Sequence, residues 1–338
     1  MYIKRRTMII QKKLEIDKEE ISPILADYDE DNYDYRNFWR GRDYEQWAET
    51  HILERLLERV GQAHWLVDLG GGFGRNAVHY HQRAEHAVIV DYSMRNLEHA
   101  AASLSAEIER GHIFLVRADL YRLPFVDSAF DAGLVVRVLH HLEHLEDALV
   151  EMGRIIGQRW ILDIPIKHHI LARARGLLHG ETRQLSNWEP KTLTTDDVPF
   201  INFHLAAVRR TLSDHGWDTT VAASANNFRR WDQVLPARAV APVRPLIYGL
   251  EMIAQTLGRG WWGPSQFVWA TRHEPVPPAT TSVAELDGLS STPGAELATK
   301  MICPVCHSTL KWSREAARCL QCSRTYPYKG SYWDFVPD

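Results

Sequence analysis

Short apolar runs alternate with segments of helical periodicity over the first half of the chain. The runs have the length of buried strands and are bounded by polar or glycine positions. They predict five strands, at residues 64–69, 87–91, 113–117, 131–136 and 160–163. Apolar residues at helical spacing predict helices over 52–60, 93–110 and 145–156. Strands separated by helices indicate an α/β fold with a parallel sheet covered on both faces.

The pattern changes after residue 164. Residues 164–202 are polar and basic, with few strand signals. Order returns with a predicted helix over 205–215 and predicted strands over 218–223 and 265–271. Residues 230–263 are apolar, but three prolines should break any long helix there: Pro236, Pro242 and Pro245.

The shifts in composition divide the chain into four parts. Residues 1–34 are charged and weakly patterned, and we expect them to form an N-terminal extension. Residues 35–273 hold the alternating pattern and form the main domain. Residues 274–300 are rich in Pro, Thr, Ser and Ala and predict a linker. Residues 301–338 then form a separate small domain.

Composition and charge narrow the class of protein. Of the 338 residues, 45% are hydrophobic and 24% are charged, as in ordinary globular proteins. The net charge of −4 argues against a protein that binds nucleic acid through bulk positive charge, although a local basic patch stays compatible. No run predicts a transmembrane helix, and the start lacks a signal-peptide pattern. Because all four cysteines fall in the last 36 residues, we expect a cytoplasmic protein with metal-bound thiolates.

A glycine-rich turn follows the first predicted strand. Gly70, Gly72 and Gly74 precede a segment of helical pattern that starts at Arg75. Glycine permits positive φ and close backbone approach, and a helix N-terminus offers free N–H groups. The turn therefore predicts a site for an anionic or nucleotide-like ligand.

Acids at strand ends favour a nucleotide. Asp91 ends the second strand, 23 residues after Asp68, where a carboxylate can accept both hydroxyls of a ribose. Asp119 follows the third strand and can hold an adenine amino group. A dinucleotide fingerprint that began at Gly70 would need glycine in place of Arg75, so the sequence departs from that alternative.

With an acid two residues ahead of a G-x-G-x-G turn, the chain resembles the class I S-adenosylmethionine (SAM)-dependent methyltransferases, specifically their type 11 group. Two further motifs carry the resemblance: Leu123-Pro124-Phe125 followed by Phe130-Asp131, and Val138-Leu139-His140-His141-Leu142. The resemblance covers residues 35–273. It implies a Rossmann-like sheet of seven strands with the last one antiparallel, and SAM over the carboxyl ends of strands one, two and four.

The resemblance also implies roles for individual residues. Gly70 and Gly72, within the turn that ends at Gly74, let the backbone approach the methionine part of SAM. Asp68 helps to place its amino group, and Asp91 takes the ribose. The adenine is bordered by the next set: Tyr92, Asp119 and Leu120.

Three residues near the methionine end complete the expected cofactor site. Arg137 ends strand four, next to the sulfonium. A helix that precedes the sheet often closes over the cofactor in such enzymes, so Arg42 or Tyr44 can reach the SAM carboxylate. The alternative is that the aromatic segment Phe38-Trp39 to Tyr44 only anchors that helix on the sheet.

Methyl transfer needs a base only where the acceptor must lose a proton. His140 and His141 follow strand four, where acceptors bind in this fold, and a neutral imidazole can take a hydroxyl proton near pH 7. The alternative is that one histidine caps the next helix or packs. Weaker candidates for the base are Asp163, His168 and His204.

The acceptor is less defined. Family members that methylate an amide or adenine nitrogen often carry Asn/Asp-Pro-Pro-Tyr after strand four, and this chain has Val136-Arg137-Val138-Leu139 there. Residues 164–202 and 230–263 are the expected substrate cover. The apolar part of this cover fits a pocket for a hydrophobic acceptor, a membrane-touching surface, or ordinary packing.

The cysteines form two C-x-x-C pairs, Cys303/Cys306 and Cys319/Cys322. Four thiolates at this spacing suit a closed, structural Zn²⁺ site. With Tyr326-Pro327, Gly330 and Asp334-Phe335, the tail resembles the zinc-ribbon activator subunit of tRNA, rRNA and release-factor methyltransferases. The resemblance implies a ribbon that docks on the catalytic domain within the same chain, or one that recruits a macromolecular substrate.

Three functions fit these features. The first is a SAM-dependent methyltransferase for a small or lipid-like acceptor, which the net charge and the apolar cover favour. The second is the same reaction on RNA or protein, with the ribbon as the recruiting element. The third is a SAM-binding regulator or scaffold without activity.

Overall fold

The computed structural model describes residues 29, 34–180, 182–195, 198–231, 237–281, 285–286 and 294–336. The predicted N-terminal extension therefore lies outside the described residues, apart from Asp29 and Asp34. Pro236 and residues 282–284 and 287–293 of the predicted linker also lie outside them. Within the described residues, no helix is both long and apolar enough to cross a membrane.

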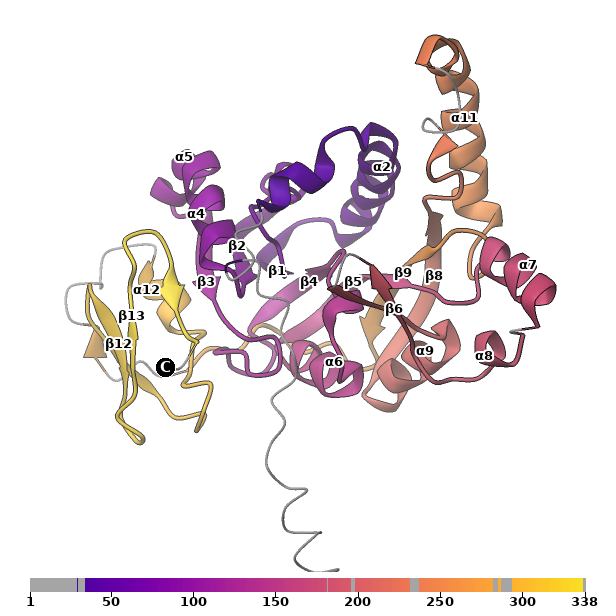
Figure 1. Cartoon of the computed structure of the whole chain (residues 1–338). Coiled ribbons are helices and arrows are strands. Elements are labelled where there is room, and N and C mark those ends of the chain that lie inside the picture. Colours follow the sequence, from indigo (N-terminus) through magenta and orange to yellow (C-terminus); the bar gives the residue numbers. More distant parts are fainter. Residues whose placement is uncertain are drawn as a thin grey trace, which may run out of the picture.

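The core of the molecule is an eight-stranded sheet with the order β14-β3-β2-β1-β4-β5-β9-β8 (Figure 1). Its strands are β1 (Ala63–Leu69), β2 (Ala84–Asp91), β3 (Ile113–Arg117), β4 (Phe130–Val135), β5 (Ile156–Pro165), β8 (Trp217–Ala225), β9 (Ser265–Arg272) and β14 (Trp333–Asp334). The neighbours from β14 to β5 pair in parallel, and β9 runs antiparallel to both β5 and β8. The predicted α/β fold and its antiparallel last strand are confirmed, and β14 adds an eighth strand from the tail.

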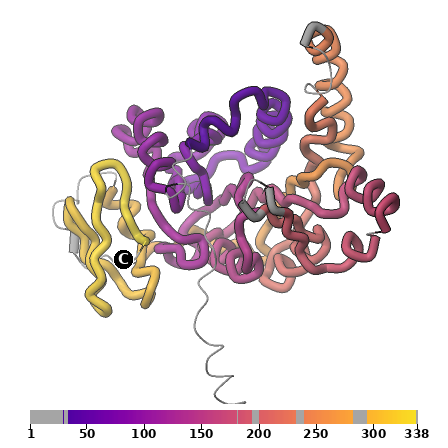
Figure 2. The backbone as a smooth tube through the Cα atoms, viewed as in Figure 1, coloured from indigo at the N-terminus to yellow at the C-terminus, as the bar shows by residue number. Residues whose placement is uncertain are grey.

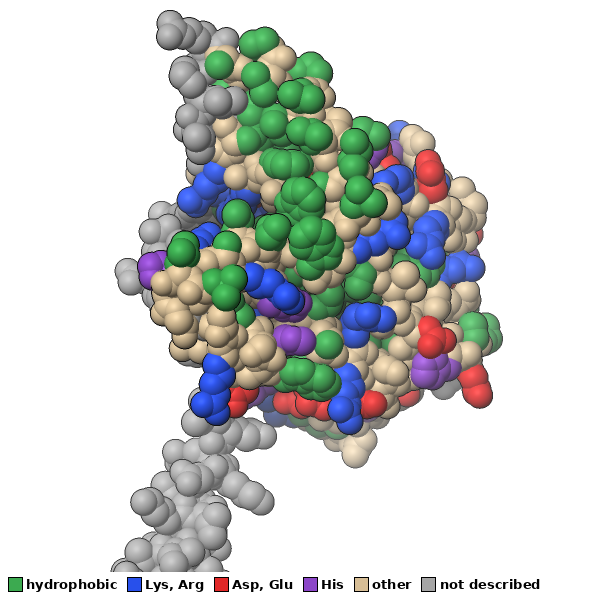
Figure 3. Space-filling view, turned by 90° about the vertical axis from the view of Figure 1, so that its right-hand side faces the viewer, with side chains coloured by type: hydrophobic (Ala, Val, Ile, Leu, Met, Phe, Trp, Pro, Cys, Tyr) green, Lys and Arg blue, Asp and Glu red, His purple; other side chains and the backbone are tan. Residues whose placement is uncertain are grey.

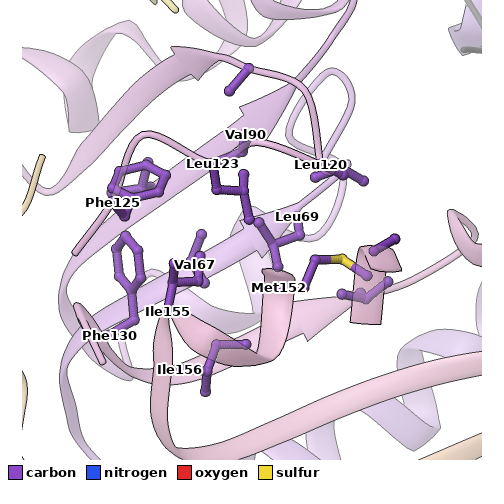
Figure 4. Packing of buried hydrophobic residues seen from close by; sticks show 14 of the residues in the cluster. Val67, Leu69, Val90, Leu120, Leu123, Phe125, Phe130, Met152, Ile155 and Ile156 are labelled. Atoms are coloured by element: carbon purple, nitrogen blue, oxygen red, sulfur yellow. The ribbon is translucent and has the colours of Figure 1, made fainter. Parts of the chain in front are cut away.

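Helices cover both faces of this sheet. They are η1 (Tyr35–Trp39), α2 (Asp43–Val60), α3 (Ala77–Tyr80), α4 (Met94–Ser103), α5 (Ser105–Glu109), η2 (Leu139–His141), α6 (Leu145–Arg154) and α9 (Leu205–Asp214). Along β1, Val67 and Leu69 pack with Met152 of α6, whereas Leu66 packs in a second core with Leu53 of α2. Figure 4 shows the first of these cores. The period of two along a strand thus separates two helical layers.

The region after β5 differs from its prediction. It contains α7 (Ile170–His179), α8 (Thr182–Ser186) and a hairpin of β6 (Lys191–Thr195) and β7 (Val198–Asn202), so the expectation of little strand structure is wrong. Polar threonines and a proline hide this hairpin from a search for apolar runs.

The prolines do not break the helix in the second insertion. Helix α11 (Ala237–Leu257) continues through both Pro242 and Pro245, so that prediction is wrong. A proline removes one N–H and frees the carbonyl four residues earlier. Both prolines lie on an exposed part of the helix, where water can satisfy the freed carbonyls. Figure 1 shows α11 standing out from the rest of the molecule.

The C-terminal residues form a small second sheet beside the large one. Its strands are β10 (Glu285–Leu286), β11 (Leu310–Trp312), β12 (Ala316–Cys319) and β13 (Thr325–Pro327), and helix α12 (Gly294–Ala298) precedes β11. The chain then leaves this sheet, and Trp333 of β14 pairs with Val116 of β3. In Figures 1 and 2 the yellow C-terminal segment lies next to β3.

Candidate functional site

The glycine turn lies at the carboxyl end of β1 and faces the segment after β4. The φ angles of Gly70, Gly72 and Gly74 are +70°, +58° and +77°. A Cβ on Gly70 would lie 2.3 Å from Cγ2 of Val138. The turn therefore lies so close to that segment that only glycine fits at this position. A Cβ on Gly74 would lie 2.6 Å from Cδ1 of Leu104, so Gly74 serves the packing of the turn on the helices.

The carboxylate of Asp91 closes the turn from the end of β2. It accepts hydrogen bonds from the N–H of Gly72 at 2.8 Å and from the N–H of Ser93 at 3.0 Å. The side-chain amide of Asn96 donates to it at 3.3 Å. Burial raises the pKa of Asp91, and these donors oppose that rise. The arrangement orients one carboxylate at the edge of the turn.

A cavity opens between the turn, the end of β2 and the segment after β4. It brings together seven predicted site residues: Gly70, Gly72, Asp91, Tyr92, Leu120, Arg137 and His141. It does not include Asp68, Gly74, Asp119, Arg42, Tyr44 or His140 among its lining residues. The sequence reasoning missed four others: Tyr35, Asn96, Val138 and Leu142. A signal existed for Asn96, because it follows the helix cap Ser93 by three residues and so lies on the same side of the first turn.

Asp68 lies behind the glycine turn and is buried. The hydroxyl of Tyr80 donates to its carboxylate at 3.1 Å. Burial raises the pKa of Asp68 to about 7, and the nearby charge of Asp91 adds to the rise. Burial makes the negative charge of Asp68 unfavourable. A cationic group bound nearby would stabilise that charge.

We expect Asp68→Asn to gain stability over the wild type as the pH rises. Between pH 3.8 and about 7, Asp68 keeps its proton in the folded protein but has lost it in the unfolded chain. The free energy of unfolding of the wild type therefore falls as the pH rises through this window, and Asp68 contributes least to stability above pH 7. The advantage of the variant should grow by about 1.4 kcal/mol for each pH unit in that window. Urea unfolding near pH 5.5 and near pH 7 measures it, with the exposed Asp147→Asn as control. An advantage that is equal at both pH values would contradict the raised pKa.

Asp119 and Leu120 follow β3, as expected. The carboxylate of Asp119 accepts the N–H of Tyr121 at 2.9 Å, which fixes the local turn. Leu120 reaches the cavity wall. Of the two, only Leu120 thus borders the cavity directly.

A buried ion-pair network lies beside the cavity at Arg137. The φ of Arg137 is +61°, a conformation that non-glycine residues adopt rarely and that often marks a functional site. Its guanidinium donates to Glu49 at 2.6 Å and to Glu45 at 3.0 Å. Arg75 pairs with Glu49 at 3.0 Å and lies over the ring of Trp39. These pairs tie the end of β4 and the glycine turn to helix α2.

Arg42 and Tyr44 lie at the start of α2, away from the cavity lining. Arg42 pairs with Glu45 at 3.1 Å. The hydroxyl of Tyr44 donates to Glu251 of α11 at 2.5 Å and accepts the N–H of Phe228 at 3.0 Å. This placement favours the packing alternative for Tyr44.

The rings of His140 and His141, which follow β4, are in contact and tilted, with centroids 3.9 Å apart. His141 borders the cavity, and His140 stacks on Phe200 of β7 at 4.2 Å. Burial lowers the pKa of His141 to about 4 and holds the pKa of His140 well below its usual value, where His141 and Arg137 add to the effect. Both rings are therefore neutral at pH 7.

The weaker base candidates lie at the end of β5 and beyond. Burial raises the pKa of Asp163 to about 7, and the hydroxyl of Ser265 donates to its carboxylate. His168 stacks on His204 at 4.6 Å, and burial lowers the pKa of His168 to about 4. None of the three is among the residues that line the cavity.

The four cysteines of the tail form one cluster. The sulfur atoms of Cys303, Cys306, Cys319 and Cys322 all lie within 4.8 Å of one another. The Sγ atoms of Cys303 and Cys322 are 3.6 Å apart, and those of Cys306 and Cys319 are 3.4 Å apart. None of the four forms a disulfide bond.

Comparison with known families gives a match over the glycine turn and the strands that follow. Residues 67–159 match a family model described as a methyltransferase domain. The match runs from β1 into β5 and includes all seven predicted residues that line the cavity. It confirms the predicted methyltransferase domain over these residues.

Two curated relatives, the O-methyltransferases rstn1 of Aspergillus nomiae and resE of Aspergillus sclerotiorum, are each 24% identical over 126 residues, or 35% of this chain. The matches cover 56% and 47% of those proteins, so the chain spans about half the length of the curated relatives it matches. Among solved structures, a chain from the complex between the Haloferax volcanii Trm112 methyltransferase activator and the putative methyltransferase is 15% identical, with a TM-score of 0.46. That match covers 68% of this chain and 90% of the other.

Proposed function

We propose that the chain is a SAM-dependent methyltransferase that acts on a small or lipid-like acceptor. The observation that carries the proposal is the cavity in which Gly70 and Gly72 face the acid Asp91 at the ends of adjacent strands. Such a turn lets the protein backbone approach a ligand closely, and the carboxylate can accept hydrogen bonds from ribose hydroxyls. The methyltransferase match covers the same residues.

Four of the predicted lining residues then have a role toward SAM. Asp91 binds the ribose, Tyr92 and Leu120 border the adenine, and Arg137 holds the wall beside the sulfonium. Asp68, behind the turn, attracts the cationic amino group, which explains why a carboxyl remains at a position that raises its pKa. Asp119 fixes the loop that carries Leu120.

SAM supplies an activated methyl carbon, so the protein mainly aligns the acceptor and excludes water. His141 lies at the cavity and is neutral at pH 7 because burial lowers its pKa to about 4. A neutral ring can accept a proton from an acceptor hydroxyl as the methyl group is transferred. His140, which stacks on Phe200 and contacts His141 with the rings tilted, holds the His141 ring in place.

Charge, composition and the matched relatives bear on the acceptor. The chain carries a net charge of −4 and an apolar insertion, both of which suit a small or lipid-like molecule more than RNA. The matched relatives from Aspergillus are O-methyltransferases, which fits a hydroxyl acceptor. We therefore propose oxygen as the accepting atom.

We propose further that the four cysteines bind a structural Zn²⁺. A tetrahedral ion with Zn–S bonds of about 2.3 Å separates its ligands by about 3.8 Å, close to the sulfur distances of the cluster. Four thiolates fill the tetrahedron, so the ion stabilises the tail and leaves no position for a substrate.

The zinc-bound tail, in this proposal, docks on the methyltransferase domain and stabilises it. Three contacts support the docking. Trp333 pairs with β3, Asp334 forms an ion pair with Arg117 at 3.2 Å, and the indole N–H of Trp65 donates to Glu296 at 2.9 Å. The first two come from the last strand of the tail, whereas Glu296 belongs to α12, which lies before the tail within the predicted linker.

Replacing Asp91 by alanine should weaken SAM binding by more than about tenfold, because it deletes a charged partner of the ribose. Isothermal titration calorimetry with S-adenosylhomocysteine and SAM measures the change. Asp147→Ala, an exposed acid on α6, should bind as the wild type does. Near-unchanged affinity of the Asp91 variant would refute the cofactor assignment. Methylated product from labelled SAM and phenolic acceptors would separate an enzyme from a SAM-binding scaffold.

A further inference from the structure

Helix α7 exposes an apolar face to solvent. Its four large hydrophobic residues occupy positions i, i+1, i+7 and i+8, and so lie on one side of the helix: Ile170, Leu171, Leu177 and Leu178. The exposed fractions of Leu177 and Leu178 are 74% and 82%. An amphipathic helix normally turns this side toward the core, so here the orientation is reversed.

Helix α11 also exposes an apolar face to solvent. Four of its five exposed large hydrophobic residues recur at i, i+4, i+7 and i+11: Leu246, Leu250, Ile253 and Leu257. The fifth, Met252, lies off this stripe. The opposite side packs on the body of the protein, where Gln255 accepts a hydrogen bond from Arg55 and Tyr248 stacks on Trp47. The exposed stripe is therefore the outer side of a helix whose inner side already has partners.

The start of α7 lies against the segment that follows α11. The N–H of Ile170 donates to the carbonyl of Trp262 at 3.3 Å. Next to it, the indole of Trp261 is 41% exposed and donates to the carbonyl of Leu257 at 3.2 Å. We call the four residues of α7, the four of α11 and Trp261 the α7–α11 surface. Figure 3 shows hydrophobic side chains along the projecting helix, with Lys and Arg side chains beside and below them.

The charge at this surface is positive. Exposed arginines lie beside its apolar residues, at Arg173 and Arg175 of α7 and at Arg259 just after α11. Residues 166–180 contain no acid, and the one acid in residues 239–263 is Glu251, which is fully buried. The chain as a whole carries a net charge of −4, so this local excess of cations is opposite in sign to the rest.

We propose that the α7–α11 surface docks on the anionic face of a lipid bilayer. Apolar residues at helical spacing, arginines alongside and a tryptophan at the margin are the features by which amphipathic helices lie in a membrane interface. Each arginine near an anionic bilayer adds to the attraction. A second copy of the chain is a poorer occupant, since a two-fold contact would bring two cationic margins together. The inference does not depend on methyl transfer.

Sedimentation of the full-length protein with vesicles tests the proposal. The wild type should bind vesicles of phosphatidylcholine with phosphatidylglycerol, bind pure phosphatidylcholine vesicles more weakly, and lose affinity as salt is raised. The double variants Leu177→Glu/Leu178→Glu and Leu246→Glu/Leu250→Glu should each weaken binding by more than about tenfold, because they replace apolar contacts by anions.

Val78→Glu is the matched control, since Val78 is 65% exposed on α3, outside the surface. It should bind vesicles as the wild type does, and all variants should keep the thermal midpoint and SAM affinity of the wild type. Vesicle binding that is absent at low salt overturns the proposal. So does a wild-type dimer, seen by light scattering, that the leucine variants convert to monomers.

Discussion

Replacing Gly70 by alanine should weaken SAM binding strongly and destabilise the fold. The added methyl group would lie 2.3 Å from Cγ2 of Val138, and the φ of +70° is unfavourable for alanine by about 1–2 kcal/mol. Overpacking of a tight contact adds about 1–3 kcal/mol. The turn must therefore move away from Val138, which displaces the backbone that faces the ligand. We expect the affinity for SAM to fall by more than about a hundredfold, because both the approach and the cavity shape are lost.

Gly61→Ala separates the cost of the positive φ from the cost of the clash with Val138. Gly61 has nearly the same φ, +71°, but a Cβ there would meet nothing within 4 Å. This variant should show the backbone cost alone in urea unfolding and should bind SAM as the wild type does. If Gly70→Ala binds SAM with the wild-type affinity, the glycine turn does not hold the cofactor.

The main sheet was predictable because its strands are local apolar runs. The strands predicted at 113–117 and 265–271 match β3 and β9 to within one residue, and the helix after Ser93 has the expected cap. The hairpin of β6 and β7 was missed, since threonines fill most of β6 and a proline interrupts β7, so neither strand shows a clear apolar run. The path of α11 was missed because the cost of a proline depends on whether water reaches the freed carbonyl.

The grouping of Gly70, Gly72 and Asp91 around one cavity was also predictable, because these residues follow strands at fixed spacing. The partners of Arg137 were not predicted, although Glu45 and Glu49 continue the apolar stripe of α2 at a spacing of four. Two acids on a buried helix face indicate buried cations. Which cations they meet depends on the packing of α2 against β4, and that is a long-range contact. Tyr35 was missed as a lining residue because its position at the cavity also depends on a long-range contact.

Removing the proposed zinc should unfold the small C-terminal sheet and weaken SAM binding through Arg117. The tail is too small for a sufficient core of its own, so metal binding supplies much of its folding free energy, about 10 kcal/mol or more in zinc-finger peptides. Arg117 donates to the carboxylate of Asp334 and to the carbonyl of Tyr92, the latter at 2.9 Å. Loss of β14 therefore frees the residue that steadies the backbone beside the adenine. We expect SAM affinity to fall several-fold while the large domain stays folded.

Metal analysis of protein purified without chelators should find one zinc ion per chain, and Cys319→Ser should lower that content. Limited proteolysis of the chelated protein should then cut within residues 301–336 and spare β1 to β5. Asp334→Ala isolates the link through Arg117, since it removes that ion pair and leaves the cysteines in place. It should reproduce the loss of SAM affinity with zinc still bound. Protein that contains no zinc, or a chelated tail that resists protease, would show that the cysteine cluster does not hold this domain together.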